Sequence, residues 1–489
     1  MARIVDPQRH ALCVKPTSTA GLLIDAEDYY RAFFKVALNA KRSIMLSGWQ
    51  FDRDVELLRG SEAENVGHPT TLLKFLNSLC EQNPELEIWI LAWDFHLVLA
   101  AERAWMQKLY FHWMTNPRLR FRFDDNHVER GCHHQKFVII DGQHSFLGGI
   151  DLCDHRWDNR AHDAKNPLRM SRGEPHQPFH DIQIYMGGPE IAGCLGELFK
   201  CRWERAGGDP MTHDIHQAIH EEHHFRPENL LALPAAEVTI SRTDPNASPT
   251  GPRPCAEIRL LYVDAIRAAE RLVYLETQYF SSHDIAEAFA ARMRDTSRGP
   301  LEIVMILNMR GETLKEQAAV GLAQAQILGR LRDIARETGH RLGLFYTMPH
   351  CSAGEQAEHG TFIHSKIMIV DDRFLTIGSA NLTNRSMAVD TELNASVESE
   401  QEDDALSLAI RHVRATLLAE HTGGPEIARV NGLVDRLNQI AERGAAGDHT
   451  EPCRLRPHPS PTMQESAALL VIDPQALPFD PDESDLPRV

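Results

Sequence analysis

The sequence predicts an α/β protein of two similar halves, each built on a mixed sheet and related by a pseudo-twofold axis, with an active site at their interface. Three observations favour this fold. The pattern H-x-K, four residues and Asp occurs twice, from His134 to Asp141 and from His364 to Asp371. Helical and strand-like stretches precede both copies in the same order. A hydrophobic content of 43% and a charged content of 25% are typical of a globular chain.

The elements of the first half follow from hydrophobic periodicity. Residues 29–40 carry apolar side chains at helical spacing, and residues 42–51 have the composition of a strand. Residues 86–91 form a second short apolar run. The apolar segment inside the first H-x-K pattern then supplies a further strand.

The second half repeats this order. Residues 258–266 indicate a helix, residues 271–280 a strand and residues 301–307 another strand, before the second H-x-K strand. Because helices alternate with apolar strands, we expect a mixed sheet in each half.

Composition also divides the chain. We expect the first half to span residues 1–228 and the second 229–443, entered through a linker or long surface loop at about 225–255 that is rich in Pro, Ser and Asn. Residues 444–489 contain repeated prolines and end acidic, so we expect a poorly ordered tail or one that lies over the surface.

Charge and cysteine content exclude several classes. The formal net charge of −18 makes a long nucleic acid an unfavourable partner. Nine scattered cysteines without a C-x-x-C pair favour reduced, mostly buried thiols. No apolar run of about 18 residues and no secretory signal are present, so we expect no spanning helix. We therefore expect a soluble protein, cytoplasmic or peripheral to a membrane, or an effector exported without a classical signal.

The H-x-K pattern suits chemistry on a phosphate. Side chains two apart in an extended segment share a face, so His134 projects with Lys136, and His364 with Lys366. A lysine lowers the pKa of the neighbouring histidine, which disfavours ordinary base catalysis. The histidine is then a nucleophile toward an anion that the lysine binds, and a phosphate fits this pair.

Two copies allow a division of labour. One neutral histidine attacks phosphorus, and the other, protonated, donates a proton to the leaving oxygen. The acid then becomes the base that activates water against the phosphohistidine. This chemistry requires neither a metal nor a cofactor. A single H-x-K before an apolar strand would carry little weight, but two copies with matched Asp and Gly offsets indicate a real site.

The chain resembles the phospholipase D superfamily, whose signature is two H-x-K-x(4)-D motifs meeting at a pseudo-twofold axis. The resemblance spans roughly residues 20–425 and is closest to the catalytic core of the eukaryotic-type enzymes. Beyond the motifs, it rests on residues 148–158, 179–189, 275–280, 378–386 and 390–392. The ends depart from the family: no amino-terminal lipid-binding domain is recognisable, and the tail is unfamiliar.

The resemblance implies roles for the catalytic residues. In the family, an acidic residue of each half orients a histidine, often across the interface, and Asp181 and Glu392 occupy these positions. Such a carboxylate fixes the tautomer and direction of the ring. Family precedent makes His134 the nucleophile and His364 the acid.

Other residues are expected to support the phosphate or the loops. Asn381 matches the family's asparagine near the phosphate. Gly149 and Ser379 follow the motifs at matched offsets, and Asp141 and Asp371 are expected to brace the loop after each strand.

The resemblance implies hydrolysis of a glycerophospholipid headgroup at a membrane surface, giving phosphatidic acid. An added alcohol should intercept the covalent intermediate in a transphosphatidylation. The alternatives are a phosphatidyltransferase of the cardiolipin synthase type and, less favoured, a nuclease-type phosphodiesterase. A degenerate lipid-binding or scaffold protein is disfavoured because both motifs are whole. Nothing in the sequence indicates the oligomeric state.

Two further stretches have open interpretations. His213, His216, His220, His223 and His224 lie at helical spacing and could bind a divalent metal, although a solvated helix face is the commoner meaning. Trp105 and Trp113 lie in an aromatic stretch that suits a lipid interface, but core packing is more usual.

Overall fold

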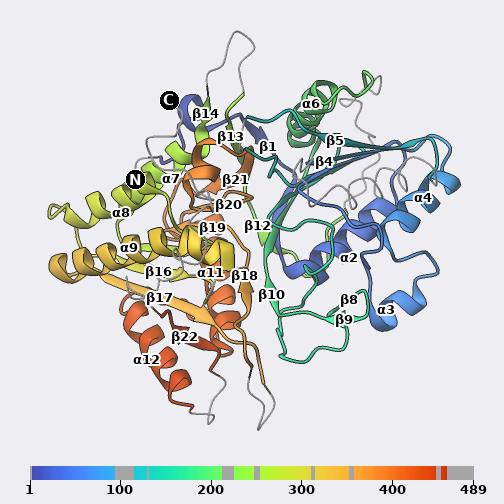
Figure 1. Ribbon diagram of the computed structural model, residues 1–489. Helices are drawn as coiled ribbons and strands as arrows, with labels where there is room; N and C mark the ends of the chain where they lie inside the picture. Colours follow the sequence, from blue (N-terminus) through green and yellow to red (C-terminus); the bar gives the residue numbers. More distant parts are fainter. Residues whose placement is uncertain are drawn as a thin grey trace.

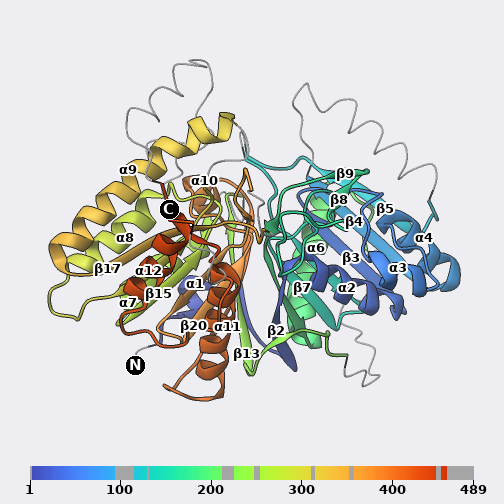
Figure 2. The same ribbon diagram turned by 90° about the horizontal axis from the view of Figure 1, so that it is seen from below.

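The structure is a computed structural model that describes residues 3–93, 115–128, 131–211, 225–246, 254–309, 314–351, 357–447 and 453–459. Two α/β halves lie side by side, each with a sheet whose outer face is covered by helices (Figures 1 and 2). The mixed α/β fold expected from the sequence is therefore confirmed.

The first sheet has eight strands among the described residues. Parallel pairing joins its strands β3, β4 and β5, and the other neighbours are antiparallel. In spatial order the strands are β12 (Leu231–Leu233), β2 (Thr19–Ile24), β11 (Ile182–Gly187), β7 (His144–Gly148), β6 (Phe137–Ile140), β3 (Ser43–Gly48), β4 (Glu87–Trp93) and β5 (Leu119–Asp124).

The second sheet has ten strands among the described residues. Its strands β15, β16 and β17 are parallel neighbours, and its other pairs are antiparallel. In spatial order they are β1 (Cys13–Pro16), β13 (Glu237–Asp244), β21 (Glu392–Glu398), β20 (Phe374–Gly378), β19 (Ile367–Val370), β15 (Leu272–Glu276), β16 (Glu302–Ile306), β17 (Arg341–Thr347) and β22 (Leu455–Pro457), with β14 (Cys255–Ala256) beside β13.

Seven strands of the two sheets correspond one to one. The order β2-β11-β7-β6-β3-β4-β5 in the first sheet matches β13-β21-β20-β19-β15-β16-β17 in the second. The parallel and antiparallel pairs also fall at the same places. The duplication read from the motifs thus extends through the sheet topology, while a pseudo-twofold axis relating the halves stays a prediction.

Helices cover the outer faces of both sheets (Figure 1). On the first half, α2 (Asp25–Leu38) and α4 (Leu72–Gln82) bury their apolar sides, including Tyr30, Phe33 and Phe75, against the sheet. On the second half, α7 (Glu257–Ala268), α8 (His283–Arg294) and α9 (Leu314–Thr338) do the same. The remaining helices are α1 (Pro7–His10), α3 (Gly60–Asn65), α6 (Pro189–Arg205), α10 (Asn384–Ala388), α11 (Ala405–Thr422) and α12 (Leu433–Ala445).

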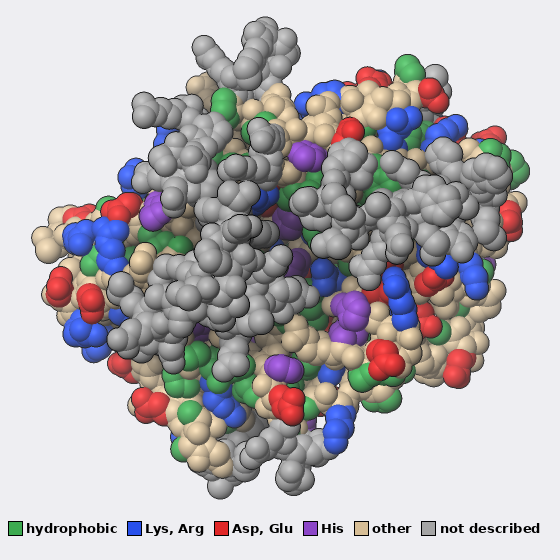
Figure 3. All heavy atoms as spheres, in the orientation of Figure 1, with side chains coloured by type: hydrophobic (Ala, Val, Ile, Leu, Met, Phe, Trp, Pro, Cys, Tyr) green, Lys and Arg blue, Asp and Glu red, His purple; other side chains and the backbone are tan. Residues whose placement is uncertain are grey.

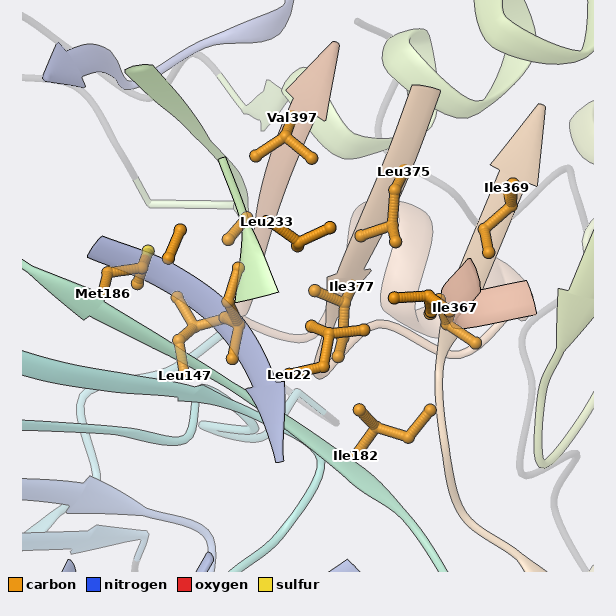
Figure 4. Packing of buried hydrophobic residues seen from close by; sticks show 14 of the residues in the cluster. Leu22, Leu147, Ile182, Met186, Leu233, Ile367, Ile369, Leu375, Ile377 and Val397 are labelled. Carbon is orange, nitrogen blue, oxygen red and sulfur yellow. The ribbon is translucent and has the colours of Figure 1, made fainter. Parts of the chain in front are cut away.

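The inner faces of the two sheets share one apolar core (Figure 4). Leu147 and Met186 of the first half face Leu375 and Ile377 of the second, and all four are fully buried. Burial of apolar surface contributes roughly 25 cal/mol per Å², so this core fixes the halves against each other. A rigid junction is what a site composed from both halves requires.

The expected boundaries need correction. The supposed linker at 225–255 contains β12 and the eight-residue β13, which pairs with β21 inside the second sheet. Its core sequence VTISRT is β-branched and strand-forming, but the prolines and asparagines around it dominated the composition.

The other expected boundaries also need correction, because strands from each expected half pair in the sheet of the other half. Strand β1 lies in the second sheet although its residues fall within the expected first half, and β12 pairs with β2 of the first sheet although it falls after residue 229. The expected tail contributes β22, which pairs with β17, so this part of it belongs to the second sheet. Edge strands of three or four residues carry too little pattern to predict.

The expectation that all cysteines are reduced is wrong for one pair. Cys13 of β1 and Cys194 of α6 form a disulfide. They are 181 residues apart, so only the tertiary fold brings them together. Of the seven free cysteines, only Cys80, Cys132 and Cys153 are buried, so the expectation of mostly buried thiols is also wrong; Cys201 is exposed, and Cys255, Cys351 and Cys453 are partly exposed.

Two open stretches lie outside the described residues: the histidine cluster from His213 to His224, and the aromatic stretch with Trp105 and Trp113. In the described part of the chain, we find no helix with the length and apolar content needed to cross a bilayer.

Candidate active site

Short backbone contacts between the halves place the two motif histidines. The His134 N–H donates to the carbonyl of Thr391 at 3.0 Å, and the His364 N–H donates to the carbonyl of His180 at 2.8 Å. Each acceptor directly precedes an acidic residue, Glu392 or Asp181. The same register therefore recurs: each histidine lies beside the carboxylate of the opposite half.

The side chains complete these crossed pairs. His134 Nδ1 lies 3.0 Å from Glu392 Oε2, and His364 Nδ1 lies 2.6 Å from Asp181 Oδ2. A carboxylate at Nδ1 fixes the ring orientation and leaves Nε2, on the opposite edge, for a substrate. The structure thus brings together the four residues that the resemblance paired.

The motif lysines lie buried beside the histidines. Lys136 Nζ donates to the carbonyl of His134 at 3.1 Å and forms an ion pair with Asp151 at 3.4 Å. Lys366 Nζ donates to the carbonyl of His364 and lies 3.5 Å from Gln278 Oε1. Burial, and to a lesser extent the positive charge of Lys136, lowers the pKa of Lys366 to about 7.

Both histidines are poised in the neutral form. Burial and then the charges of Lys136 and Lys366 hold the pKa of His134 well below its ordinary value. Burial and then Lys366, with Arg156 and Lys136, do the same to the pKa of His364. Because each lysine acts on both rings, the two motifs form one electrostatic site.

The pKa values of the orienting carboxylates, Asp181 and Glu392, shift in the opposite direction to those of the histidines. Burial raises the pKa of Asp181 to about 7, against the lowering effect of Lys366. Burial also raises the pKa of Glu392 to about 7, against a hydrogen bond from Ser379. Each histidine–carboxylate pair therefore exchanges a proton near neutral pH.

The motif aspartates lie away from this chemistry, at the strand ends. The Asp141 carboxylate accepts hydrogen bonds from the N–H groups of Lys41, Arg42 and Ser43 at 2.7–2.9 Å. Both aspartates have positive φ, 52° and 54°. Asp371 accepts the same three bonds from Glu270, Arg271 and Leu272. This geometry agrees with a bracing role.

The small residues after the strands differ between halves. A Cβ added to Gly149 would lie 2.3 Å from Asp181 Oδ1, so only glycine leaves room for that carboxylate. Its counterpart Ser379 donates its hydroxyl to Glu392 Oε2 and receives the Leu393 N–H at 3.0 Å.

Asn381 and Asp151 are a second unequal pair. Asn381 is buried, and its Oδ1 has no hydrogen-bond partner among the described residues. Asp151, at the same offset, accepts from the Trp49 N–H at 2.9 Å and pairs with Lys136. The first half therefore places a charged carboxylate at this position, beside Lys136, where the second half has a neutral amide.

Sequence reasoning did not assign roles to four neighbours of the site: Asp151, Arg156, Phe179 and Gln278. The Phe179 ring centroid lies 5.2 Å from that of His364, and the Arg156 guanidinium lies over Phe179 at 5.0 Å. This packing accompanies the lower exposure of the His364 side chain, 8% against 17% for His134. Asp151, Arg156, Phe179 and Gln278 all fall in segments that carry the resemblance, which was the available signal.

Histidine side chains gather near the middle of the face in Figure 3, along the junction of the halves. Within the described residues, none of the six catalytic candidates belongs to a group with metal-ligand spacing. Such spacing occurs in groups that share His180, the neighbour of Asp181.

Comparison with known proteins agrees with this site. Residues 262–412, which contain the second motif, match the family model described as "Cardiolipin synthase, PLD-like domain". Phospholipase D alpha 4 of Arabidopsis thaliana is 26% identical over 82% of this chain and 64% of its own length. Phospholipase D alpha 3 of the same plant is 24% identical over 74% and 58%. This chain thus spans about three fifths of these relatives.

A solved structure shares the fold. The phosphatidylserine synthase of Haemophilus influenzae Rd KW20 superposes with a TM-score of 0.53 at 13% identity, covering 88% of this chain and 92% of that one. The family model and the relatives together support a member of the phospholipase D superfamily.

Proposed function

We propose that this enzyme cleaves the headgroup phosphodiester of a glycerophospholipid through a covalent phosphohistidine. The observation that carries the proposal is the pair of crossed histidine–carboxylate contacts, His134–Glu392 and His364–Asp181, beside two buried lysines. A two-step phosphoryl displacement needs a nucleophile and a general acid, and a histidine can serve as either.

In the first step, neutral His134 attacks phosphorus through Nε2 while ionised Glu392 accepts the Nδ1 proton in a hydrogen bond. The bond from phosphorus to the headgroup oxygen breaks. The His364–Asp181 pair, which holds one proton below about pH 7, delivers that proton to the leaving alcohol. The product is a phosphatidyl group bonded to His134 Nε2.

In the second step, His364 takes a proton from water, and the resulting hydroxide displaces His134 to give phosphatidic acid. Both sites return to their starting protonation. Lys136 and Lys366 balance the negative charge on the non-bridging oxygens throughout. Preorganised charge of this kind typically supplies roughly 3–4 kcal/mol per group. The chemical step as proposed requires no metal or cofactor.

A lipid is the favoured substrate on two grounds. The relatives above are named phospholipase D, and the net charge of −18 opposes a long polyanion. The substrate would be met at a membrane surface, because its acyl chains remain in the bilayer.

The test is incubation with phosphatidylcholine vesicles in the presence of ethanol. We expect free choline, phosphatidic acid and phosphatidylethanol, the last formed when ethanol replaces water in the second step. A chain that releases no choline and forms no phosphatidylethanol would contradict the proposal.

A second candidate is a phosphatidyltransferase of the cardiolipin synthase type, favoured by the family model that matches residues 262–412. It uses the same intermediate, with a lipid alcohol as acceptor. Phosphatidylglycerol offered as both donor and acceptor separates the two: cardiolipin as the main product supports the transferase, and phosphatidic acid supports the hydrolase. A plasmid-nicking assay tests the less favoured alternative, a nuclease-type phosphodiesterase.

A further inference from the structure

A buried ion pair lies beside the first motif and has no part in the proposed mechanism. Arg202, near the end of α6, and Asp124, the last residue of β5, are both buried. The guanidinium donates to Asp124 Oδ2 from Nε at 3.1 Å and from Nη2 at 2.9 Å. Two donors on one carboxylate fix the plane of the guanidinium, so the direction of its third nitrogen is fixed as well.

The third nitrogen of this guanidinium contacts the motif. Arg202 Nη1 donates to Gln135 Oε1 at 3.1 Å and to Ser47 Oγ, on β3, at 2.9 Å. Gln135 stands between His134 and Lys136 and is itself buried. Because side chains alternate along an extended segment, the Gln135 side chain lies on the opposite face from those of its two neighbours. One arginine therefore joins the motif to β3, β5 and α6 from behind the catalytic face.

Gln135 extends this connection across the junction of the halves. Its Nε2 donates to the backbone carbonyl of Glu392 at 3.2 Å. A guanidinium only donates hydrogen bonds, so it turns the amide oxygen of Gln135 toward Arg202 and leaves the amide nitrogen for Glu392. The carboxylate of the same glutamate lies 3.0 Å from His134 Nδ1. The contacts thus run without a break from Arg202 to the nucleophile of the proposed mechanism.

A second route leads from the ion pair to the same place. His133 Nε2 lies 3.2 Å from Asp124 Oδ1, and its Nδ1 lies 3.0 Å from Thr391 Oγ1. Burial, and then the charge of Arg202, lowers the pKa of His133, so this ring is neutral and uses one nitrogen as a donor and the other as an acceptor. The Thr391 carbonyl in turn accepts the His134 N–H at 3.0 Å. Both residues of the 391–392 segment are therefore held from the first half.

The second half has no charged pair at the equivalent place. The strand that corresponds to β5 is β17, and its last residue is Thr347. The hydroxyl of Thr347 lies 3.1 Å from Nδ1 of His421, on α11. Burial lowers the pKa of His421, against the charge of Glu276, so this contact joins neutral groups. The buried ion pair thus accompanies the half that carries His134.

Stability alone is a weak reason for a buried ion pair. Removal of two charges from water costs about as much as their attraction returns, and apolar residues of similar volume are often equally stable. The arginine supplies directed donors instead, in a rigid and planar arrangement. Each of these donors acts on a group that belongs to the motif or to a strand beside it.

We propose that Arg202 and Gln135 are positioning residues that hold the Glu392 carboxylate against His134 Nδ1. The inference rests on the proposed two-histidine mechanism, in which His134 attacks through Nε2. Loss of either residue lets Glu392 move away from the ring and slows attack. Binding of the phosphate is retained, because Lys136 and Lys366 are left in place.

The first test is the coupling of Gln135 to Glu392. Gln135→Met removes the amide without leaving a charge unpaired by its own loss of charge, since glutamine is neutral. It should lower kcat/KM, which reports attack by His134, about tenfold, while inorganic phosphate should inhibit at an unchanged concentration. In a Glu392→Gln background, which already lacks the carboxylate, Gln135→Met should cost less than about twofold more. A further tenfold loss in that background would show that Gln135 does not act through Glu392 and would overturn the proposal.

The second test removes the ion pair and uses a matched control. Asp124→Asn with Arg202→Met removes both charges together, so neither is left alone in the interior. The control is Asp372→Asn with Arg414→Met, which removes another buried pair whose bonds are 2.7 and 2.8 Å long, between the end of β19 and α11. Thermal unfolding should change similarly in both double variants, and kcat/KM should fall about tenfold only in the first. Equal kcat/KM in the two would leave Arg202 a purely structural role and contradict the proposal.

The choice of substrate separates this inference from the proposed function. Each variant is assayed on phosphatidylcholine vesicles and on bis(4-nitrophenyl) phosphate, a diester without acyl chains. A wild-type chain that cleaves only the nitrophenyl diester would count against the lipid substrate, and the coupling of Gln135 to Glu392 would still be measured on that diester. Cleavage of both substrates with additive effects of Gln135→Met and Glu392→Gln would leave the proposed function standing and overturn the positioning role.

Discussion

The two motif loops hold their strands alike but surround their histidines differently. Asp141 and Asp371 each accept three backbone N–H groups at equivalent places, so the frames of the two halves are interchangeable. Beyond the frame, the short Asp181 meets His364 across the room left by Gly149, whereas the longer Glu392 meets His134 with the help of Ser379.

The exposures differ as well. The His134 side chain is 17% exposed, and His364, packed against Phe179, is 8% exposed. The more exposed ring suits the nucleophile of the proposed mechanism, and the more enclosed ring suits its acid. The lesson is that duplication supplies a common scaffold, and local substitutions make the surroundings of the two histidines unequal.

The largest expected effect separates the histidines. His134→Ala should abolish turnover of every substrate, because no nucleophile remains. His364→Ala should lower kcat on phosphatidylcholine by ~10²–10⁴-fold, yet retain release of nitrophenol from a phosphatidyl nitrophenol in the first turnover, because that leaving group needs no proton. Steady-state rates with phosphatidylcholine and first-turnover release of nitrophenol measure this. Equal loss on the nitrophenol ester in both variants would remove the asymmetry.

The lysines should matter nearly as much, and in both halves. Lys136→Met and Lys366→Met each remove a buried cation from the phosphate and should lower kcat/KM by ~10²–10³-fold. The exposed Lys74 on α4 gives a matched control, since Lys74→Met leaves the site untouched. If a variant of either motif lysine had the same kinetics as the control, the proposed role of these lysines in binding the phosphate would be contradicted.

The pH profile distinguishes the carboxylates. Glu392, with a pKa of about 7, is protonated below that pH and then donates to His134 Nδ1, which places the remaining ring proton on the attacking Nε2. Activity should therefore fall as pH drops below 7. It should also fall above 7, as Asp181 and Lys366 lose their protons.

Glu392→Gln imitates the protonated acid at every pH. It should lower kcat/KM by about 10- to 100-fold and remove the acidic limb, leaving the alkaline limb in place. An acidic limb unchanged in Glu392→Gln would show that another group controls it.

Substitutions of the two small residues, Gly149 and Ser379, should have unequal effects on kcat/KM. Gly149→Ala places a methyl group against Asp181 and should reduce kcat/KM about as much as loss of that carboxylate, about 10- to 100-fold. Ser379→Gly removes one hydrogen bond to Glu392, worth about 1 kcal/mol, and should cost about fivefold. Matching losses in the two variants would mean that the loops are equivalent after all.

The smallest effect on catalysis belongs to the motif aspartates. Asp141→Ala and Asp371→Ala each leave three backbone N–H groups without an acceptor and should lower the free energy of unfolding by about 2–4 kcal/mol. Urea titrations should give similar values for both, with kcat of the folded fraction retained. A large loss of kcat without a loss of stability would assign these residues to the chemistry.

Much of this site could be predicted because four of its residues lie in two short sequence motifs. His134, Lys136, His364 and Lys366 follow from spacing alone, and the helices and strands before them follow from periodicity. Asp181 and Glu392 lie far from the histidines that they contact, so only the family resemblance indicated them.

Other features depend on contacts that no linear pattern carries. Strand β13 was hidden by surrounding prolines, and the Cys13–Cys194 disulfide joins residues 181 positions apart. The disulfide depends on the tertiary fold, whereas β13 forms by pairing with β21 inside the second sheet.

The identity of the covalently modified histidine tests the central claim most directly. A reaction quenched at alkaline pH within the first turnover, digested and analysed by mass spectrometry, would locate the phosphatidyl group. The account predicts the adduct on the peptide that contains His134, and its accumulation in His364→Ala with the nitrophenol ester. An adduct on His364, or the absence of any adduct in a chain that turns over, would contradict it.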